Sequence, residues 1–208
     1  MGNRISTIPV EIETSDGPTL RGQRYGEESP RWVVLVHDEG QDLDAWRSLV
    51  GPLVGLGLRV LAFDLPGHGA SDDPWEPSSL PTHVLAALRY ADSHGARSLY
   101  LIGAGAGATA ALVAAGECEV QAIVALSPRA ELDGVASDAV RKAPAPKLIV
   151  VGGEDPVAAE AAADVHRRSI GWGVLQAPPV AEQGTQLLES EWGEHVAENA
   201  LAFLRDYL

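Results

Sequence analysis

Residues 99–115 join an apolar run to an alanine-rich segment through a turn built only of glycine and alanine. The run Leu99–Ile102 predicts a buried β-strand, and the segment Ala108–Ala115 predicts a helix. The turn at 103–107 reads Gly-Ala-Gly-Ala-Gly, and glycine tolerates the backbone conformations that a tight reversal requires. A strand that leads through a tight turn into a helix is typical of an α/β protein with a parallel sheet.

The rest of the chain repeats this alternation of strand and helix. Residues 7–13 and 18–25 alternate apolar and polar side chains around Ser15–Gly17, which predicts an initial β-hairpin. Further strands are predicted at Arg31–His37, Leu58–Asp64, 98–103, Val120–Leu126, Lys147–Val151 and Gly173–Gln176. Helices are predicted at Leu43–Val54, 78–94, Pro156–Arg168 and Glu189–Tyr207, and Ser127–Pro146 is predicted to be irregular. We therefore expect one domain, residues 1–208, with a mostly parallel central sheet and helices on both faces.

Composition excludes several classes of partner. Fifteen basic against 29 acidic residues give a net charge of −14, which repels phosphate backbones and argues against nucleic acid. No apolar run approaches the length of a membrane span, and the first residues lack the apolar core of a secretory signal. We therefore expect a cytoplasmic protein with no membrane partner, while the sequence leaves its oligomeric state open.

No cofactor or metal is expected. The single cysteine, Cys118, excludes an internal disulfide and a cysteine-based metal site. His83, His94 and His166 lie on predicted helices without a histidine or cysteine partner three or four residues away. The glycine turn could suggest dinucleotide binding, but no acidic strand end about twenty residues further on is placed to bind a ribose.

Several segments together resemble the α/β-hydrolase fold family, over nearly the whole chain from about residue 8. They are Val34–His37 with the loop after it, Asp64–Ser71 (Asp-Leu-Pro-Gly-His-Gly-Ala-Ser), the turn 103–107, Val151–Asp155 and Glu182–Leu188 before the last helix. The resemblance implies the α/β-hydrolase fold, and is greatest to small esterases similar to dienelactone hydrolases. The short segment 127–146 implies that the cap domain found in many members is missing.

The resemblance also assigns three positions to a catalytic triad in the order nucleophile, acid, histidine. In the nucleophile motif Gly-x-Ser-x-Gly the serine position is Gly105, the acid position is Asp155, and Gln183 stands where His-Gly is expected. Glycine has no atom that can attack a carbonyl, and glutamine has no usable proton-accepting pKa near neutrality. Asp155 is followed by Pro156, so it also has the pattern of a helix N-cap.

The family's oxyanion hole and pocket map onto a second group of residues. The resemblance implies backbone donors from Asp38, Glu39 and Ala106, with Ala104 and Ser127 nearby at the same edge. Backbone donors do not depend on side-chain identity, yet two acidic side chains would bring negative charge to a site for a developing anion. His37 ends its strand at this edge, where it is expected to help position the oxyanion loop.

Two functional hypotheses follow from these residues. In the first, the chain has lost serine hydrolase activity and binds a small acyl or apolar ligand, or a protein partner. In the second, it remains a carboxylic-ester hydrolase with a displaced nucleophile, Ser127 or Asp64, assisted by His37 or His68. The loss of both Gly105 and Gln183 as reactive groups favours the first hypothesis.

Overall fold

The computed structural model describes residues 5–135 and 138–208. The strands are β1 (Thr7–Glu13), β2 (Thr19–Tyr25), β3 (Arg31–Val36), β4 (Arg59–Phe63), β5 (Ser98–Ala104), β6 (Ala122–Leu126), β7 (Lys147–Val150) and β8 (Gly173–Gln176). The α-helices are α1 (Arg47–Gly55), α2 (Leu80–Ser93), α3 (Gly105–Ala114), α4 (Pro156–Arg168) and α5 (Gly193–Arg205). Short 3-10 helices are η1 (Leu43–Trp46), η2 (Pro77–Ser79), η3 (Ala139–Arg141) and η4 (Gly184–Leu188).

All eight strands form one sheet in the order β1-β2-β4-β3-β5-β6-β7-β8. The first two strands form the predicted antiparallel hairpin, and β2 also pairs antiparallel with β4. Every other neighbouring pair is parallel. The predicted architecture, an α/β-hydrolase fold with a mostly parallel sheet and no separate cap, is confirmed.

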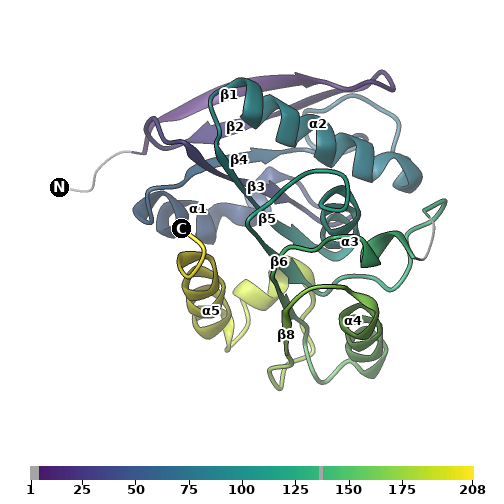
Figure 1. The fold of residues 1–208 in the computed structure, drawn as a ribbon. Helices are drawn as coiled ribbons and strands as arrows, with labels where there is room; N and C mark the ends of the chain where they lie inside the picture. Colours follow the sequence, from purple (N-terminus) through teal and green to yellow (C-terminus); the bar gives the residue numbers. More distant parts are fainter. Residues whose placement is uncertain (1–4, 136–137) are drawn as a thin grey trace.

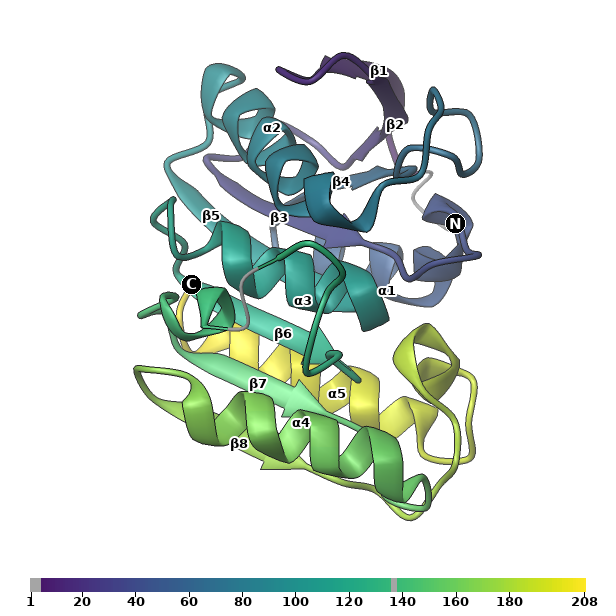
Figure 2. The same ribbon diagram turned by 90° about the vertical axis from the view of Figure 1, so that its right-hand side faces the viewer.

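Helices cover both faces of the sheet (Figures 1 and 2). Helices α2, α3 and α4 lie on one face, and α1 and α5 lie on the other. Strand β3 shows why its sequence is apolar from Trp32 onward: Val34 and Val36 pack into the first layer, while Val33 and Leu35 pack into the second. Successive side chains point to opposite faces, so the interior of a strand covered on both faces favours apolar residues.

Several helix boundaries differ from those expected. Helix α3 begins at Gly105 rather than Ala108, because the glycines of the turn are themselves the start of the helix. The last helix begins at Gly193 rather than Glu189 and ends at Arg205 rather than Tyr207. A turn precedes it, in which the Gly193 N–H donates to the Ser190 carbonyl at 2.9 Å.

The carboxyl ends of β3, β5, β6 and β7 share one edge, and their loops form the candidate site.

Candidate functional site

The three positions assigned to the triad lie on one pocket at the carboxyl edge of the sheet. The pocket has a volume of about 500 Å³. Its lining residues are Asp38, Gly105, Ser127, Pro128, Arg129, Ala130, Glu131, Asp155, Val157, Ala158, Ala161 and Gln183. Gly105, Asp155 and Gln183 therefore face a common space although they are far apart in the sequence. This is the crevice in which parallel α/β sheets generally bind ligands.

The turn from β5 into α3 has the backbone of a nucleophile elbow. Gly105 adopts a φ of +52°, in the left-handed region that such a turn requires. A Cβ at Gly107 would lie 2.2 Å from the His37 carbonyl oxygen, and one at Gly103 would lie 2.5 Å from the Ala108 Cα. The flanking glycines therefore let the helix pass close to its neighbours, and their presence reflects the geometry of the turn.

The space beside Gly105 is occupied by the side chain of Asp38. A Cβ built on Gly105 would lie 2.0 Å from the Asp38 Cγ and Oδ2 and 2.1 Å from Oδ1. In a serine hydrolase that space belongs to the side chain of the nucleophile. Asp38 comes from the loop after β3, so a side chain from a neighbouring loop occupies the space that a side chain at position 105 would need.

Asp38 also takes the backbone donors that were expected to form an oxyanion hole. The N–H groups of Ala106 and Glu39 both donate to Asp38 Oδ1 at 2.8 Å. The N–H of Asp38 itself donates to Gln41 Oε1 at 3.4 Å. The expected donors are present, but each already has an acceptor within the chain, so none is turned to a substrate carbonyl.

Arg129 holds this arrangement in place. Its Nη2 donates to Asp38 Oδ1 at 2.9 Å, and its Nη1 donates to Glu39 Oε2 at 3.0 Å. The backbone of Arg129 is fixed in turn by Thr109 on α3, whose hydroxyl accepts from the Arg129 N–H at 2.9 Å and donates to its carbonyl at 3.0 Å. The guanidinium thus offsets the negative charge of the two neighbouring carboxylates.

Gln183 is held by hydrogen bonds at every polar atom of its amide. Its Oε1 accepts from the Ser127 hydroxyl at 2.6 Å and from the Gly152 N–H at 3.2 Å. Its Nε2 donates to the carbonyls of Gly152 and Ala181, both at 3.1 Å. Gln183 therefore connects the loops after β6 and β7, and its amide supplies no proton acceptor for catalysis.

Ser127 sits beside Gln183 with a strained backbone. Its φ of +48° places it alone among the described non-glycine residues in the left-handed region, which costs energy for a residue with a Cβ. Its hydroxyl donates to Gln183 and accepts from the Gly184 N–H at 2.9 Å. No histidine contacts this hydroxyl among the described residues, so Ser127 lacks the base that would activate it.

Asp155 serves as the N-cap of α4. Its Oδ1 accepts from the N–H groups of Val157 at 2.9 Å and Ala158 at 3.1 Å, and Pro156 fills the first helical position. This is the arrangement that the Asp-Pro pair predicted. The capped carboxylate lines the pocket, and among the described residues no histidine is hydrogen-bonded to it.

His37 and His68 hold loops together and are turned away from the pocket. The Leu65 N–H donates to His37 Nε2 at 2.9 Å, so His37 Nδ1 carries the proton and donates to the Asp38 carbonyl at 2.7 Å. Burial lowers the pKa of His37 and keeps its ring neutral. His68 Nε2 accepts from the Gly40 N–H at 2.8 Å. Both rings are committed to the backbone, so neither supplies a base to the pocket.

Of the six residues expected at the pocket or the oxyanion hole, Asp38 and Ser127 line the pocket. The side chains of His37, Ala104 and Ala106 are fully buried and lie outside the pocket lining, and Glu39 contributes its side chain to the ion pair with Arg129. Sequence reasoning also missed Arg129 and the apolar wall formed by α4. Both could have been expected near the site, because Arg129 lies in the loop after β6 and α4 follows β7, and both strands end at this edge.

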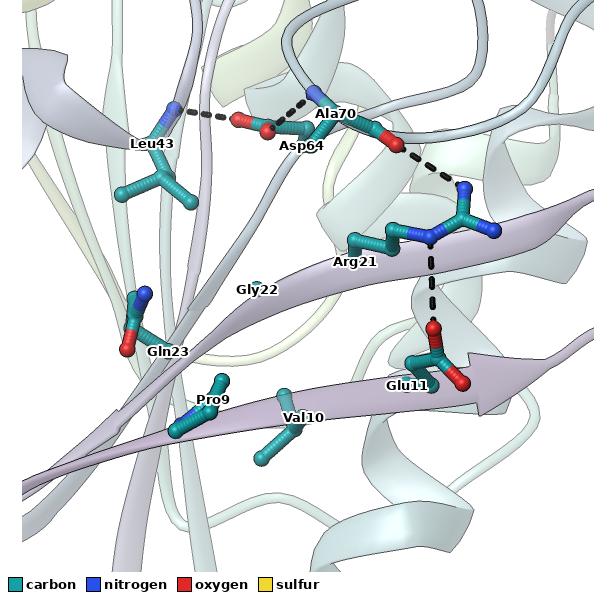
Figure 3. A pocket seen from close by; sticks show the side chains of 9 residues that line it. All are labelled: Pro9, Val10, Glu11, Arg21, Gly22, Gln23, Leu43, Asp64 and Ala70. Atoms are coloured by element: carbon teal, nitrogen blue, oxygen red, sulfur yellow. Dashed lines mark hydrogen bonds and ion pairs between the residues drawn. The ribbon is translucent and has the colours of Figure 1, made fainter.

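Asp64, the other displaced nucleophile that was considered, faces a different cavity (Figure 3). That cavity has a volume of about 420 Å³ and lies beside the β1–β2 hairpin. Asp64 Oδ1 accepts from the Leu43 N–H and Oδ2 from the Ala70 N–H, both at 2.8 Å. A Cβ at Gly69 would lie 2.1 Å from Oδ2, so the loop closes tightly over this carboxylate. Asp64 therefore fixes a loop and is separated from the elbow pocket.

The chain belongs to the α/β-hydrolase family. A sequence profile described as alpha/beta hydrolase fold matches residues 31–170, more than half of the chain. No group of three histidine, cysteine, aspartate or glutamate side chains in the described part of the chain is arranged to hold a metal ion. Within the same part, no helix is both long and apolar enough to cross a lipid bilayer.

Curated relatives share segments of the chain. An esterase of Mycobacterium tuberculosis is 39% identical over 61 residues, 29% of this chain and 19% of its own. The dihydrolipoyllysine-residue acetyltransferase component of the acetoin cleaving system of Cupriavidus necator is 31% identical over 129 residues, 61% of this chain and 34% of its own. A haloalkane dehalogenase of Mycobacterium marinum is 40% identical over 68 residues, 31% and 23% of the two chains. The matched segments thus span about a fifth to a third of these relatives.

Solved structures share the fold along the full length. An esterase of Pyrococcus furiosus superimposes with a TM-score of 0.84 at 17% identity, covering 100% of this chain and 97% of its own. A dienelactone hydrolase of Anabaena variabilis gives 0.80 at 21% identity, covering 99% and 100%. Identities this low establish the fold alone.

Proposed function

We propose that this chain is an α/β-hydrolase-fold protein that no longer catalyses acyl transfer and instead binds a small organic molecule in the pocket beside Gly105. One observation carries the proposal. The Asp38 carboxylate stands in the space of the nucleophile and accepts the Ala106 N–H that would otherwise stabilise an oxyanion. The Asp38 side chain therefore takes both the space that a nucleophile would need and a hydrogen-bond donor that an oxyanion would need.

Each chemical step of ester hydrolysis lacks its group here. Gly105 provides no nucleophile, and the Gln183 amide provides no base. A tetrahedral intermediate would place its negative oxygen against the Asp38 carboxylate, so the charge that develops would be repelled rather than stabilised. The retained pocket of about 500 Å³ nevertheless has the size of a small-molecule site.

Two measurements on the wild-type protein test the loss of activity. We expect turnover of p-nitrophenyl acetate at the rate of buffer alone, and no covalent labelling by a fluorophosphonate probe. Ser127→Ala is the control, and it should be indistinguishable from the wild type in both assays. Because the Ser127 hydroxyl donates to Gln183 and lacks a base, probe labelling of Ser127 would show that this proposal is wrong.

A second test introduces a serine and a histidine at the triad positions, once with the Asp38 side chain in place and once without it. Gly105→Ser with Gln183→His should remain unlabelled, because a Cβ at position 105 would collide with Asp38. Adding Asp38→Gly clears the space and frees the Ala106 N–H, so the triple variant should be labelled at position 105. Equal labelling of the double and triple variants would mean that Asp38 does not block the site.

The second candidate function is ester hydrolysis by Ser127. The strained φ of +48° favours it, because such strain is often stored at functional positions. The two hydrogen bonds of the Ser127 hydroxyl give the strained backbone a structural reason, since they tie the loop after β6 to Gln183 and Gly184. Turnover that disappears in Ser127→Ala would establish this second function in place of the first.

A further inference from the structure

The carboxylate of Asp38 is bonded unevenly at its two oxygens. Oδ1 accepts from the N–H groups of Glu39 and Ala106 and from Arg129. Oδ2 receives no hydrogen bond from the described residues and lies toward Gly105, 2.0 Å from the position of a Cβ there. Since Asp38 and Gly105 both line the pocket, a charged acceptor with free capacity stands at its base.

The other polar groups at the pocket base are already satisfied. Both oxygen and nitrogen of the Gln183 amide are bonded within the chain, and the Ser127 hydroxyl both donates and accepts. A ligand carbonyl or carboxylate would find the Ala106 N–H already bonded to Asp38. A ligand with N–H or O–H donors would meet the free oxygen of Asp38.

Charge and shape agree with this polarity. The carboxylates of Asp38, Glu131 and Asp155 line the pocket against the single guanidinium of Arg129, which already pairs with Asp38 and Glu39. The apolar part of the lining consists of Pro128, Ala130, Val157, Ala158 and Ala161. The pocket thus combines an apolar wall with a negative base, which suits a cation attached to an apolar group.

We infer that the pocket binds a small organic cation, a primary ammonium on an apolar body, with the ammonium donating to Asp38 Oδ2. The inference rests on the proposed function, because it requires that the Ala106 N–H be taken by Asp38. The pocket of an ester hydrolase must stabilise negative charge beside its elbow. In this chain the same place presents negative charge, so its preference is reversed.

Benzylammonium and benzoate test this preference, since they share an aromatic body and carry opposite charges. Binding is followed at neutral pH by amide chemical shifts in ¹H–¹⁵N spectra of the full chain. We expect benzylammonium to bind at least tenfold more tightly than benzoate and to shift the amides of Gly105, Ala106 and Gly184. Equal or tighter binding of benzoate would overturn the inference without the use of any variant.

Variants then assign the effect to Asp38. Asp38→Asn keeps an oxygen for the Ala106 N–H but removes the charge, and we expect benzylammonium binding to weaken at least tenfold. Glu154→Gln makes the same change in net charge at an exposed position outside the pocket lining, and should alter binding less than threefold. An equal loss in both variants would mean that the preference for benzylammonium comes from the overall negative charge of the protein, and it would overturn the inference.

A third variant predicts a reversal. Asp38→Ala leaves the Ala106 N–H and Nη2 of Arg129 without the Asp38 acceptor, so benzoate should bind at least tenfold more tightly than to the wild type. Ester turnover separates this inference from the proposed function. Turnover by the wild type would overturn both, whereas absence of turnover together with absence of a charge preference would overturn the inference alone.

Discussion

Replacing Gly105 by alanine should destabilise the protein far more than the same change at an unobstructed glycine. Two costs add. The φ of +52° places the new residue in the left-handed region, which costs about 1 kcal/mol or slightly more for a residue with a Cβ. The new Cβ would also lie about 2 Å from three atoms of the Asp38 carboxylate, which must move away.

The second cost follows from what Asp38 gives up when it moves. It loses the hydrogen bonds from the Ala106 and Glu39 N–H groups, and a hydrogen bond to a charged group contributes about 1.5 kcal/mol or more. The ion pair with Arg129 adds little, because both side chains are partly exposed. We therefore expect Gly105→Ala to cost about 4 kcal/mol of unfolding free energy. In an Asp38→Ala background only the backbone strain remains, about 1 to 2 kcal/mol.

Urea unfolding followed by far-ultraviolet circular dichroism measures the full cycle of single and double variants. The matched control is Gly95→Ala, where φ is +92° and an added Cβ would meet no atom within 4 Å. It should cost about 1 kcal/mol, with or without Asp38→Ala. If Gly105→Ala costs no more than Gly95→Ala, or if its cost is the same without the Asp38 carboxylate, the reasoning about the occupied elbow is wrong.

Two further predictions concern the residues around the pocket. Asp155→Ala should lower the unfolding free energy by about 1 kcal/mol because α4 loses its cap, whereas Asp155→Asn should retain most of it, as urea titration would show. Lowering the pH from 7 to 5 should reduce stability, because burial lowers the pKa of His37 and of His83, so the unfolded chain binds protons that the folded chain does not. His37→Gln should flatten this dependence by up to about 1.4 kcal/mol per pH unit, and an unchanged slope in His37→Gln would contradict the assignment.

The sheet could be predicted from the sequence because the pattern of apolar residues in a strand depends on which of its faces are covered. A run such as 32–36 is apolar at every position since both of its faces are covered, and the hairpin alternates because one of its faces is not. The boundaries of α3 and α5 were less accessible. Glycine suggests a break in a helix, and nothing local in the sequence indicates that Gly105 and Gly193 stand at the beginning of one.

For the site, the sequence could indicate only which positions belong to it, and the roles of those positions stay predictions from resemblance. The sequence places Gly105, Asp155 and Gln183 at strand ends, so it could indicate that they meet at one edge. It could also indicate that Asp38 and Glu39 bring negative charge there. The direction of the Asp38 side chain could not be read, because it depends on hydrogen bonds to residues 106 and 129, both more than sixty positions away.

The relation between Asp38 and Gly105 bears on how a nucleophile could be introduced at position 105. The carboxylate can reach the Ala106 N–H only while position 105 has no side chain, because the two would occupy the same volume. A serine at 105 alone would therefore meet a displaced carboxylate, an unaltered Gln183 and a disturbed loop. A nucleophile at position 105 therefore requires the removal of Asp38 as well, and each change alone leaves buried N–H groups or a collision. Under the proposed function, this dependence of the two positions on each other means that folding stability, as well as the missing groups, opposes hydrolysis by this chain.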